Sequence, residues 1–279
     1  MLVNLNDVLI PARRGKYAVG LFNTVNLELA RGVMEAAGEL DSPVIIGTAE
    51  VLLPYGPIED LANLLIPMAE RVSVPVVVHL DHGLKEETCR QALDLGFSSI
   101  MYDCSTMEYE ANIEHVKRMA ETAHACGASI EAELGHVGDN GGEDPSLFYT
   151  DSAQARDFIE RTGADALAIA VGTAHGAYKL PPKLDFNRIA EIAENIPTPL
   201  VLHGGSGLSD SDFRTAVERG ISKVNIFTDI NQACARAAAL GYREGMGLTD
   251  IILPEIEAVK QSVMEKMRLF GSVGRGSER

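Results

Sequence analysis

The stretch VVVHLD at Val76–Asp81 is an almost continuous apolar run that ends in polar side chains. It lacks the strict alternation of apolar and polar residues that is typical of a strand with one face in water. Strands that are buried on both faces, as in parallel sheets, have this continuous pattern instead. The stretch therefore predicts an interior strand of a parallel sheet, with polar groups at the point where it ends.

Seven more runs of this kind recur along the chain, and segments with helical periodicity separate them. The eight predicted strands are Ala18–Asn23, Val44–Thr48, Val76–Asp81, Ser99–Asp103, Ser129–Gly135, Ala166–Gly172, Leu200–Gly204 and Lys223–Phe227. Apolar residues three and four positions apart predict helices at Leu27–Leu40, Glu108–Cys126 and Asp185–Asn195. Eight strand–helix units favour an α/β fold, a (β/α)₈ TIM barrel, over a doubly wound open sheet.

The length fits one domain over residues 1–279, because barrels of this kind often run to about 250 residues as a single domain. An additional C-terminal helix is predicted at about Leu253–Phe270. We expect the tail that follows it, GSVGRGSER, to fray as chain ends often do.

Composition limits the class of partner. The chain has 24 Lys and Arg against 40 Asp and Glu, a formal net charge of −16, which argues against nucleic acid or an anionic membrane as its partner. A small phosphorylated ligand stays compatible, because a few local donors are enough to bind it. Four scattered cysteines without a CxxC pair, no secretory signal and no apolar run of about 18 residues predict a cytoplasmic protein.

Histidines gather where the predicted strands end, which is the catalytic face of such a barrel. Four of the seven histidines lie at or just past strand ends, namely His79, His82, His175 and His203. Three nitrogen ligands and an open fourth position are typical of a catalytic zinc site, and we expect His82, His175 and His203 to form one. A hydrogen-bonded loop histidine is the alternative for each of them. His79 lies within an apolar run, which favours a place in the core or behind the ligands.

Carboxylates follow the same strands. Asp81 adjoins His82 and can either orient it or act as a general acid or base toward a substrate. Asp103 and Glu133 lie on neighbouring strands, where a second cation position or a supporting role is plausible. Glu131 is explained equally well as a buried, paired carboxylate and as a functional group.

Two glycine-rich segments suggest ligand contacts. HGGSG at His203–Gly207 leads into a helix near Asp210, and such turns expose N–H groups that can cradle a phosphate. The loops after strands 7 and 8 are the usual phosphate corner of this fold, which Gly176 and Lys179 can also reach. A solvated loop lysine is the alternative for Lys179. Residues 135–151, GHVGDNGGEDPSLFYTD, are typical of a lid or of a disordered loop.

Together these segments resemble the class II, zinc-dependent ketose-bisphosphate aldolases, which include fructose- and tagatose-bisphosphate aldolases. The matches occur in the family's order across residues 18–230. They are Gly20–Asn23, Ser42–Ile45, His79–His82, Ser99–Asp103, Glu131–Gly135, Gly172–Lys179, His203–Gly207, and Asn225-Ile226 with Thr228-Asp229.

The resemblance implies an aldehyde-lyase that reversibly cleaves a ketose 1,6-bisphosphate or ketose 1-phosphate into dihydroxyacetone phosphate and an aldehyde, through a metal-stabilised enediolate. It implies Zn²⁺ on His82, His175 and His203, with Glu133 and Asp103 near the metal. Asp81 would handle the proton of the C4 hydroxyl. A monovalent cation (Na⁺ or K⁺) and a homodimer or homotetramer are also implied. The implied phosphate- and donor-binding set is Asn23, Gly176, Lys179, Gly204, Gly205, Ser206, Asn225 and Thr228.

The chain departs from the family pattern at positions that bear on the substrate. Ala49 stands where a serine is common, Cys104 where glycine is usual, and Phe227 where a small or polar residue is usual. The arginine that binds the distal phosphate in related enzymes has no clear counterpart, and Arg236 and Arg243 are the candidates. We therefore expect an intact dihydroxyacetone phosphate half, and an aldehyde that is either glyceraldehyde 3-phosphate or a compound without that phosphate.

Three other functions compete with this one. A Schiff-base aldolase needs a lysine inside the barrel near a strand end, and Lys223 starts strand 8 at the wrong end. A zinc hydrolase barrel typically has His-x-His after strand 1, where this chain has Leu21–Thr24. An aldolase-like non-catalytic regulatory subunit stays the alternative, because Ala49 and Phe227 depart from the pattern.

Overall fold

Eight parallel strands close into a barrel in their order along the chain. The computed structural model describes residues 1–137, 149–174 and 183–278. The strands are β1 (Val19–Asn23), β2 (Val44–Ala49), β3 (Val76–Gly83), β4 (Ser99–Tyr102), β5 (Ser129–Leu134), β6 (Ala166–Ile169), β7 (Leu200–Leu202) and β8 (Ile221–Ile226). This architecture confirms the predicted TIM barrel. The single-domain boundary at residues 1–279 stays a prediction.

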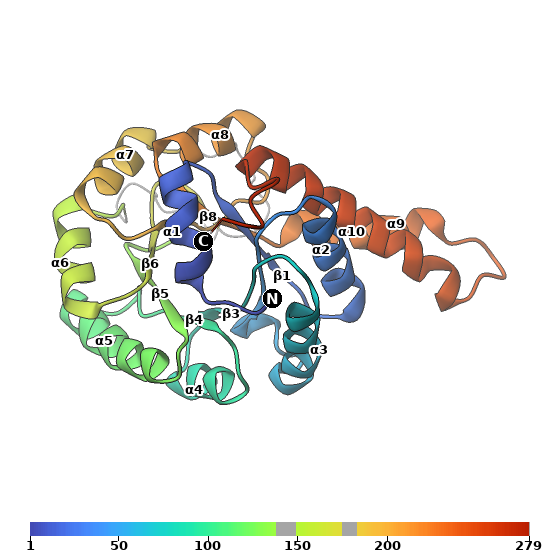
Figure 1. The fold of residues 1–279 in the computed structure, drawn as a ribbon, viewed down its shortest axis with the longest axis horizontal. Coiled ribbons are helices and arrows are strands. Elements are labelled where there is room, and N and C mark those ends of the chain that lie inside the picture. Colours follow the sequence, from blue (N-terminus) through green and yellow to red (C-terminus); the bar gives the residue numbers. More distant parts are fainter. Residues whose placement is uncertain (138–148, 175–182, 279) are drawn as a thin grey trace.

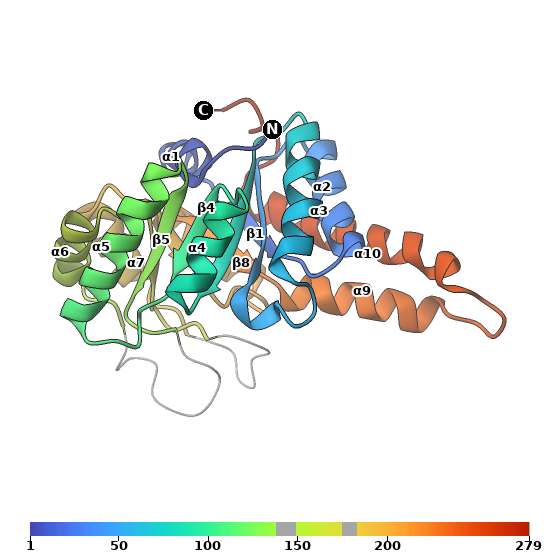
Figure 2. The same cartoon turned by 90° about the horizontal axis from the view of Figure 1, so that it is seen from below.

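Helices surround the barrel and separate successive strands (Figure 1). A short 3₁₀ turn, η1 (Glu50–Leu52), follows β2. The helices are α1 (Leu5–Gly15), α2 (Leu27–Glu39), α3 (Ile58–Arg71), α4 (Glu86–Asp94), α5 (Tyr109–Ala125), α6 (Ser152–Thr162), α7 (Phe186–Asn195), α8 (Asp210–Arg219), α9 (Thr228–Gly241) and α10 (Leu248–Phe270). The last two form a hairpin that extends beyond the ring of helices (Figures 1 and 2).

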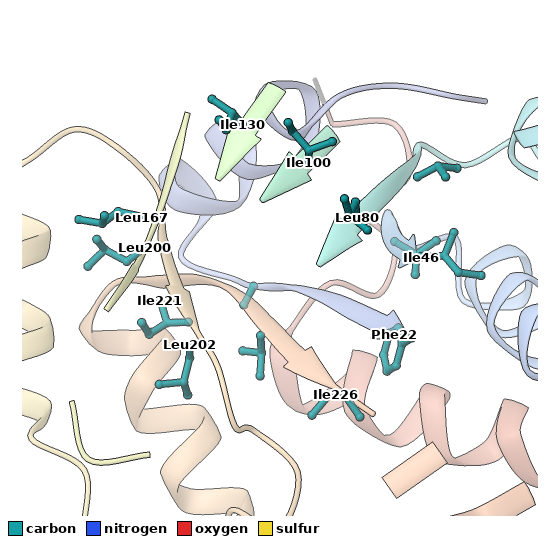
Figure 3. Packing of buried hydrophobic residues seen from close by; sticks show 14 of the residues in the cluster. Phe22, Ile46, Leu80, Ile100, Ile130, Leu167, Leu200, Leu202, Ile221 and Ile226 are labelled. Carbon is teal, nitrogen blue, oxygen red and sulfur yellow. The ribbon is translucent and has the colours of Figure 1, made fainter. Parts of the chain in front are cut away.

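The strands are buried on both faces, as their continuous apolar pattern predicted. Alternate side chains point outward and pack under the helices, and Figure 3 labels ten of them around the circle of strands. The other set fills the inside of the barrel. At the base of the barrel, apolar residues of this inner set, such as Val19, Ile45 and Val77, pack against Leu5 and Leu9 of α1. Helix α1 therefore covers the end of the barrel where both chain termini lie (Figure 2).

The structure adds one helix that was not predicted and corrects two expectations about the ends of the chain. Helix α1 was not predicted, although Asn4 and Asp7 form a capping box at its start. The predicted C-terminal helix is present, but it begins at Leu248 instead of Leu253. The tail does not fray, because Gly274 donates a backbone hydrogen bond to Leu40 and Ser272 is completely buried.

Two further expectations concern the class of protein. Within the described residues, no helix combines the length and the apolarity that a bilayer span requires. All four cysteines are free thiols, which agrees with the expected lack of a disulfide framework. The predicted lid falls largely on residues 138–148, which lie outside the described residues.

Candidate active site

An irregularity at the end of β3 turns two neighbouring side chains toward the same cavity. Adjacent strand residues normally point to opposite faces of a sheet. Here the pairing of β3 with β4 shifts between Leu80 and Gly83, and His82 has a φ of 42°, in the left-handed region that residues other than glycine rarely adopt. A bulge of this kind re-aims a side chain. Asp81 and His82 consequently both line the cavity at the mouth of the barrel.

His82 is held by a carboxylate on the next strand. Its Nδ1 lies 2.8 Å from Oδ2 of Asp103, and its ring meets that of His203 edge to face, with 4.5 Å between the ring centroids. Burial alone would lower the pKa of His82. Asp81, the hydrogen bond to Asp103 and the charge of Glu133 outweigh burial and raise this pKa to about 9.

Asp81 is fixed by two amides from the other side of the barrel mouth. Asn23 donates to Oδ2 at 2.7 Å and Asn225 donates to Oδ1 at 2.9 Å, and the carboxylate is nearly completely buried. Burial would raise the pKa of Asp81, but the charges of His82 and His203 prevail and hold it well below its usual range. Asp81 is therefore an oriented, ionised carboxylate.

The same two asparagines keep an acceptor for a ligand. The amide oxygens of Asn23 and Asn225 are buried and have no hydrogen-bond partner among the described residues. Both residues line the cavity. They were predicted to bind substrate, and the structure adds a contact with Asp81 that sequence reasoning did not assign.

His203 lies at the end of β7 and is completely buried. Its Nε2 is 2.8 Å from Oε1 of Glu131, and its Nδ1 is 3.4 Å from Oε2 of Glu133. Burial and the nearby charge of Asp103 raise the pKa of Glu133 to about 8. Glu131 is a buried, paired carboxylate, which is one of its two predicted interpretations, and its partner is Lys223.

The position of Lys223 differs from the expected one. Strand β8 begins at Ile221, so Lys223 is the third residue of the strand and lies inside the barrel, completely buried. The expectation that it starts the strand at the wrong end was therefore wrong by two residues. Its ammonium group pairs with Glu131 at 2.6 Å and does not line the cavity at the mouth, which argues against a Schiff-base role.

Among the described residues, two groups of three side chains that include His82 can hold a metal ion. Their ligand atoms lie within 4.8 Å of one another, in one group from Asp81, His82 and His203 and in the other from His82, Asp103 and Glu133. Imidazole and carboxylate donors suit zinc. A cation would also offset the negative charge of Asp103, whose proximity raises the pKa of Glu133. The residues present thus fit a divalent metal, while His175 lies outside the described residues.

The site opens into a cavity of about 530 Å³. Its lining combines the polar residues described above with apolar residues after β2, β3 and β8. The full lining is Asn23, Ala49, Val51, Leu52, Asp81, His82, Leu84, Asp103, His136, Val137, Gly204, Gly205, Ser206, Asn225, Ile226, Phe227 and Thr228.

The cavity includes a corner that is suited to an anion. Gly204 has a φ of 65°, and a Cβ there would stand 2.3 Å from the backbone oxygen of Ala174, so only glycine fits this turn. Helix α9 begins at Thr228 beside this turn, and its N-cap residue, Phe227, makes no side-chain capping bond. The backbone N–H of Phe227 itself donates to the Ser206 hydroxyl at 3.3 Å. Exposed N–H groups at a helix start bind phosphate readily. Gly205 and Ser206 line the same cavity, whereas Gly176 and Lys179 lie outside the described residues.

Sequence reasoning missed several residues of the cavity. His136 lies 3.1 Å from the Ser105 hydroxyl and lines the wall next to Glu133, and only its place just after strand 5 could have signalled it. Val51 and Leu52 of η1 and Leu84 after β3 were also not predicted, because isolated apolar residues outside the strands carry no distinctive pattern. Among the described residues no lysine or arginine lines the cavity, and the candidates Arg236 and Arg243 lie exposed on α9 and the turn after it.

The family model described as fructose-bisphosphate aldolase class-II matches residues 3–275. The chain belongs to this family. A fructose-bisphosphate aldolase of Geobacillus stearothermophilus is 40% identical over 287 residues, which cover 99% of each chain. The uncharacterized protein YdjI of Escherichia coli (strain K12) is 39% identical over 262 residues, which cover 93% of this chain and 94% of YdjI.

A solved structure supports the same assignment. The crystal structure of the YdjI aldolase from Escherichia coli K12 has a TM-score of 0.91 at 36% identity, and the match covers 99% of this chain and 100% of the other. As a member of the class-II aldolase family, the chain is an aldolase, a carbon–carbon lyase. The family is metal-dependent and acts on phosphorylated sugars, which agrees with the cluster of metal-binding groups at the mouth.

Proposed function

We propose that this chain is a zinc-dependent aldolase that reversibly cleaves a ketose 1-phosphate or ketose 1,6-bisphosphate into dihydroxyacetone phosphate and an aldehyde. One observation carries the proposal. The possible ligand atoms of His82, His203 and the anchored Asp81 lie within 4.8 Å of one another. Asp81 and His82 line the cavity that also contains the start of α9, and His203 lies buried behind them. A metal ligand set, an oriented acid–base group and a phosphate corner are the parts that this reaction needs.

His82 and His203 would hold the metal together with His175, and Glu133 and Asp103 would offer an alternate or second position. A bound zinc ion supplies a Lewis acid that polarises the substrate carbonyl. The protein contributes the orientation of its ligands, since Asp103 fixes His82 and Glu131 contacts His203.

Asp81 acts as the acid–base group for the hydroxyl next to the bond that breaks. In the cleavage direction the ionised carboxylate accepts the proton of the C4 hydroxyl, and in the condensation direction it returns that proton. Its two amide partners, Asn23 and Asn225, keep it at a fixed angle. Their free amide oxygens are available to accept hydrogen bonds from substrate hydroxyls.

The phosphate of dihydroxyacetone phosphate binds at the turn of Gly204, Gly205 and Ser206 and at Thr228, where α9 starts. Support comes from the uncapped helix start and from the glycine geometry of the turn. We propose Gly176 and Lys179, which lie outside the described residues, as further phosphate-binding residues, together with a monovalent cation (Na⁺ or K⁺).

Of the two substrates, we favour the ketose 1-phosphate, whose aldehyde half carries no second phosphate. The wall that faces it carries Val51, Leu52, Leu84 and Phe227, together with the family departure Ala49. Apolar groups do not replace the hydration of a dianion, and a buried phosphate requires charged or N–H partners. Comparable turnover of fructose 1,6-bisphosphate and of the best ketose monophosphate would contradict this part of the proposal.

The decisive experiment is exchange of the C3 proton of dihydroxyacetone phosphate into deuterated water. We expect exchange that stops when a strong chelator is added and returns with zinc. Asp81→Ala should keep this exchange and lose cleavage, because Asp81 handles the proton of the other half-reaction. A folded, zinc-loaded protein without exchange would contradict the proposal and would favour the aldolase-like regulatory subunit.

The chain assembles into a homodimer or homotetramer. Support comes from apolar side chains that stay exposed on the α9–α10 hairpin, with exposed fractions from 55% to 72%: Leu240, Tyr242, Leu248 and Leu253. Gathered apolar groups on a surface commonly mark an interface. Light scattering that gives the mass of a single chain, 30.0 kDa, would contradict this expectation. The cytoplasmic location stays a prediction.

A further inference from the structure

Three buried side chains contact one another in a row below the mouth of the barrel. Glu131 on β5 accepts a hydrogen bond from the ammonium group of Lys223 on β8, with 2.6 Å between Oε2 and Nζ. Its other oxygen, Oε1, lies 2.8 Å from Nε2 of His203. All three side chains are completely buried. The reaction proposed above gives Lys223 no role.

An ion pair is an unusual way to fill this space. The interiors of TIM barrels are dominated by branched apolar side chains. The strand neighbours of Lys223 follow that rule, because its register partners on β1 and β7 are Val19 and Val201. Replacing a buried ion pair by apolar residues of similar volume is often neutral or stabilising. Stability alone therefore does not explain a lysine and a glutamate at these positions.

The contacts of Glu131 decide which nitrogen of His203 carries the proton. An ammonium group only donates, so Oε2 of Glu131 accepts from Lys223, and Oε1 is presented to His203 as a second acceptor. Nε2 of His203 is then the donor, and the lone pair of the neutral ring is on Nδ1. Nδ1 lies on the side of the metal-binding groups, where Oε2 of Glu133 is 3.4 Å away.

We propose that Glu131 and Lys223 are positioning residues that fix the ring and the tautomer of His203 for metal binding. The inference rests on the proposed function, because it takes His203 as a zinc ligand. Lys223 provides the opposite charge that a buried carboxylate needs, and it occupies Oε2 so that Oε1 is left for His203. Hydrogen-bond partners behind a metal-binding histidine typically change metal affinity by about 10- to 100-fold.

Glu131→Gln tests the tautomer, because it keeps the shape of the side chain. Lys223 still requires an acceptor, so the amide oxygen turns to Nζ and the amide NH₂ group turns to His203. The ring then accepts at Nε2 and carries its proton on Nδ1, the nitrogen that the metal needs. Zinc affinity, measured by competition with a chromogenic chelator, should fall by about 100-fold.

The double variant E131Q/K223M should recover part of this loss. Without the ammonium group, the amide can turn over and offer its oxygen to Nε2 of His203 again. We expect zinc affinity to rise by about 10-fold over Glu131→Gln. Two residues that only stabilise the fold would not give such a recovery. Histidine-selective ¹⁵N NMR of the metal-free full chain reads the tautomer directly, with the proton on Nδ1 only in Glu131→Gln.

Ser99→Ala is the matched control. Ser99 is also completely buried, but its hydroxyl binds Nδ1 of His79 at 2.8 Å. This variant should keep the zinc affinity and the tautomer of the wild type. Unchanged zinc affinity in folded Glu131→Gln, or a proton that stays on Nε2 of His203 there, overturns the proposal. A wild-type chain that binds no zinc overturns the proposed function and this inference with it, so the wild-type measurement separates the two failures.

Discussion

The two asparagines that hold Asp81 allow a sharp test of the mouth of the barrel. Asn23 and Asn225 each donate to a different carboxylate oxygen, at 2.7 and 2.9 Å. A hydrogen bond to a charged group contributes about 1.5–3 kcal/mol, and one pKa unit corresponds to about 1.4 kcal/mol. Asn23→Ala or Asn225→Ala should therefore raise the pKa of Asp81 by about one to two units. That pKa starts well below its usual range, so Asp81 stays ionised at neutral pH.

The variants should lose orientation of Asp81 and keep its charge. A carboxylate with only one anchored oxygen can rotate away from the hydroxyl that it serves. A displacement of about 1 Å in such a group can cost about 100-fold in rate. We expect the kcat of cleavage to fall by this order in Asn23→Ala and in Asn225→Ala, while the zinc content stays that of the wild type.

The assay couples cleavage of a ketose phosphate to enzymatic reduction of the dihydroxyacetone phosphate released. Asn195→Ala is the matched control, because Asn195 donates a similar hydrogen bond, at 2.8 Å to the backbone oxygen of Ser152, outside the site. The control should lose some stability and keep its rate. Wild-type rates in both Asn23→Ala and Asn225→Ala would refute the reasoning, since Asp81 would then need neither anchor.

Four further predictions concern the metal and the fold. Zinc affinity should fall about tenfold for each pH unit below the His82 pKa of about 9, because the ring must lose its proton to bind. Chelator competition across this range measures the affinity, and an affinity that does not change with pH would contradict the prediction. Since this pKa is raised from 6.5, the metal-free chain should lose the corresponding stability in thermal melts as the pH rises from about 6.5 to 9. Gly47→Ala should lower the free energy of unfolding, measured with denaturant, by about 3 kcal/mol, because a Cβ would stand 1.8 Å from the backbone oxygen of His79. Gly38→Ala is the control: its Cβ meets nothing within 4 Å, so this variant should not destabilise the protein. Ser272→Ala should cost about 1 kcal/mol, since its buried hydroxyl bonds Ser42 at 2.8 Å, and an unchanged unfolding midpoint would mean that the tail contributes nothing.

The barrel could be predicted because burial of both strand faces leaves a strong local signal. Each predicted strand overlaps an observed one, and the errors lie at the ends, as with β8, which begins two residues before Lys223. Helix α1 was missed because its apolar face is explained only by the barrel base against which Leu5 and Leu9 pack. The tail was misjudged for the same reason, since Ser272 is buried through contacts with residues far away in the sequence.

The residues of the candidate site could be predicted from the sequence, but the contacts between them could not. Strand ends identified Asp81, His82 and His203, and the structure brings these three together. Strict alternation would have placed Asp81 and His82 on opposite faces, and only the bulge in β3 puts both in the cavity. Contacts across the barrel, such as that between Asn225 and Asp81, depend on closure of the whole sheet and leave no local pattern.

The interior of the barrel changes in character from base to mouth, and this gradient separates stability from chemistry. At the base, Val19, Ile45 and Val77 pack against α1, and each fully buried side chain of this size contributes about 1.5–3 kcal/mol. The layer above holds the ion pair of Glu131 and Lys223. Such a buried pair contributes no more to stability than apolar residues of similar volume would. The apolar base therefore stabilises the barrel, while the layer of Glu131 and Lys223 contributes little stability. That layer can instead be selected for how it orients His203 above it.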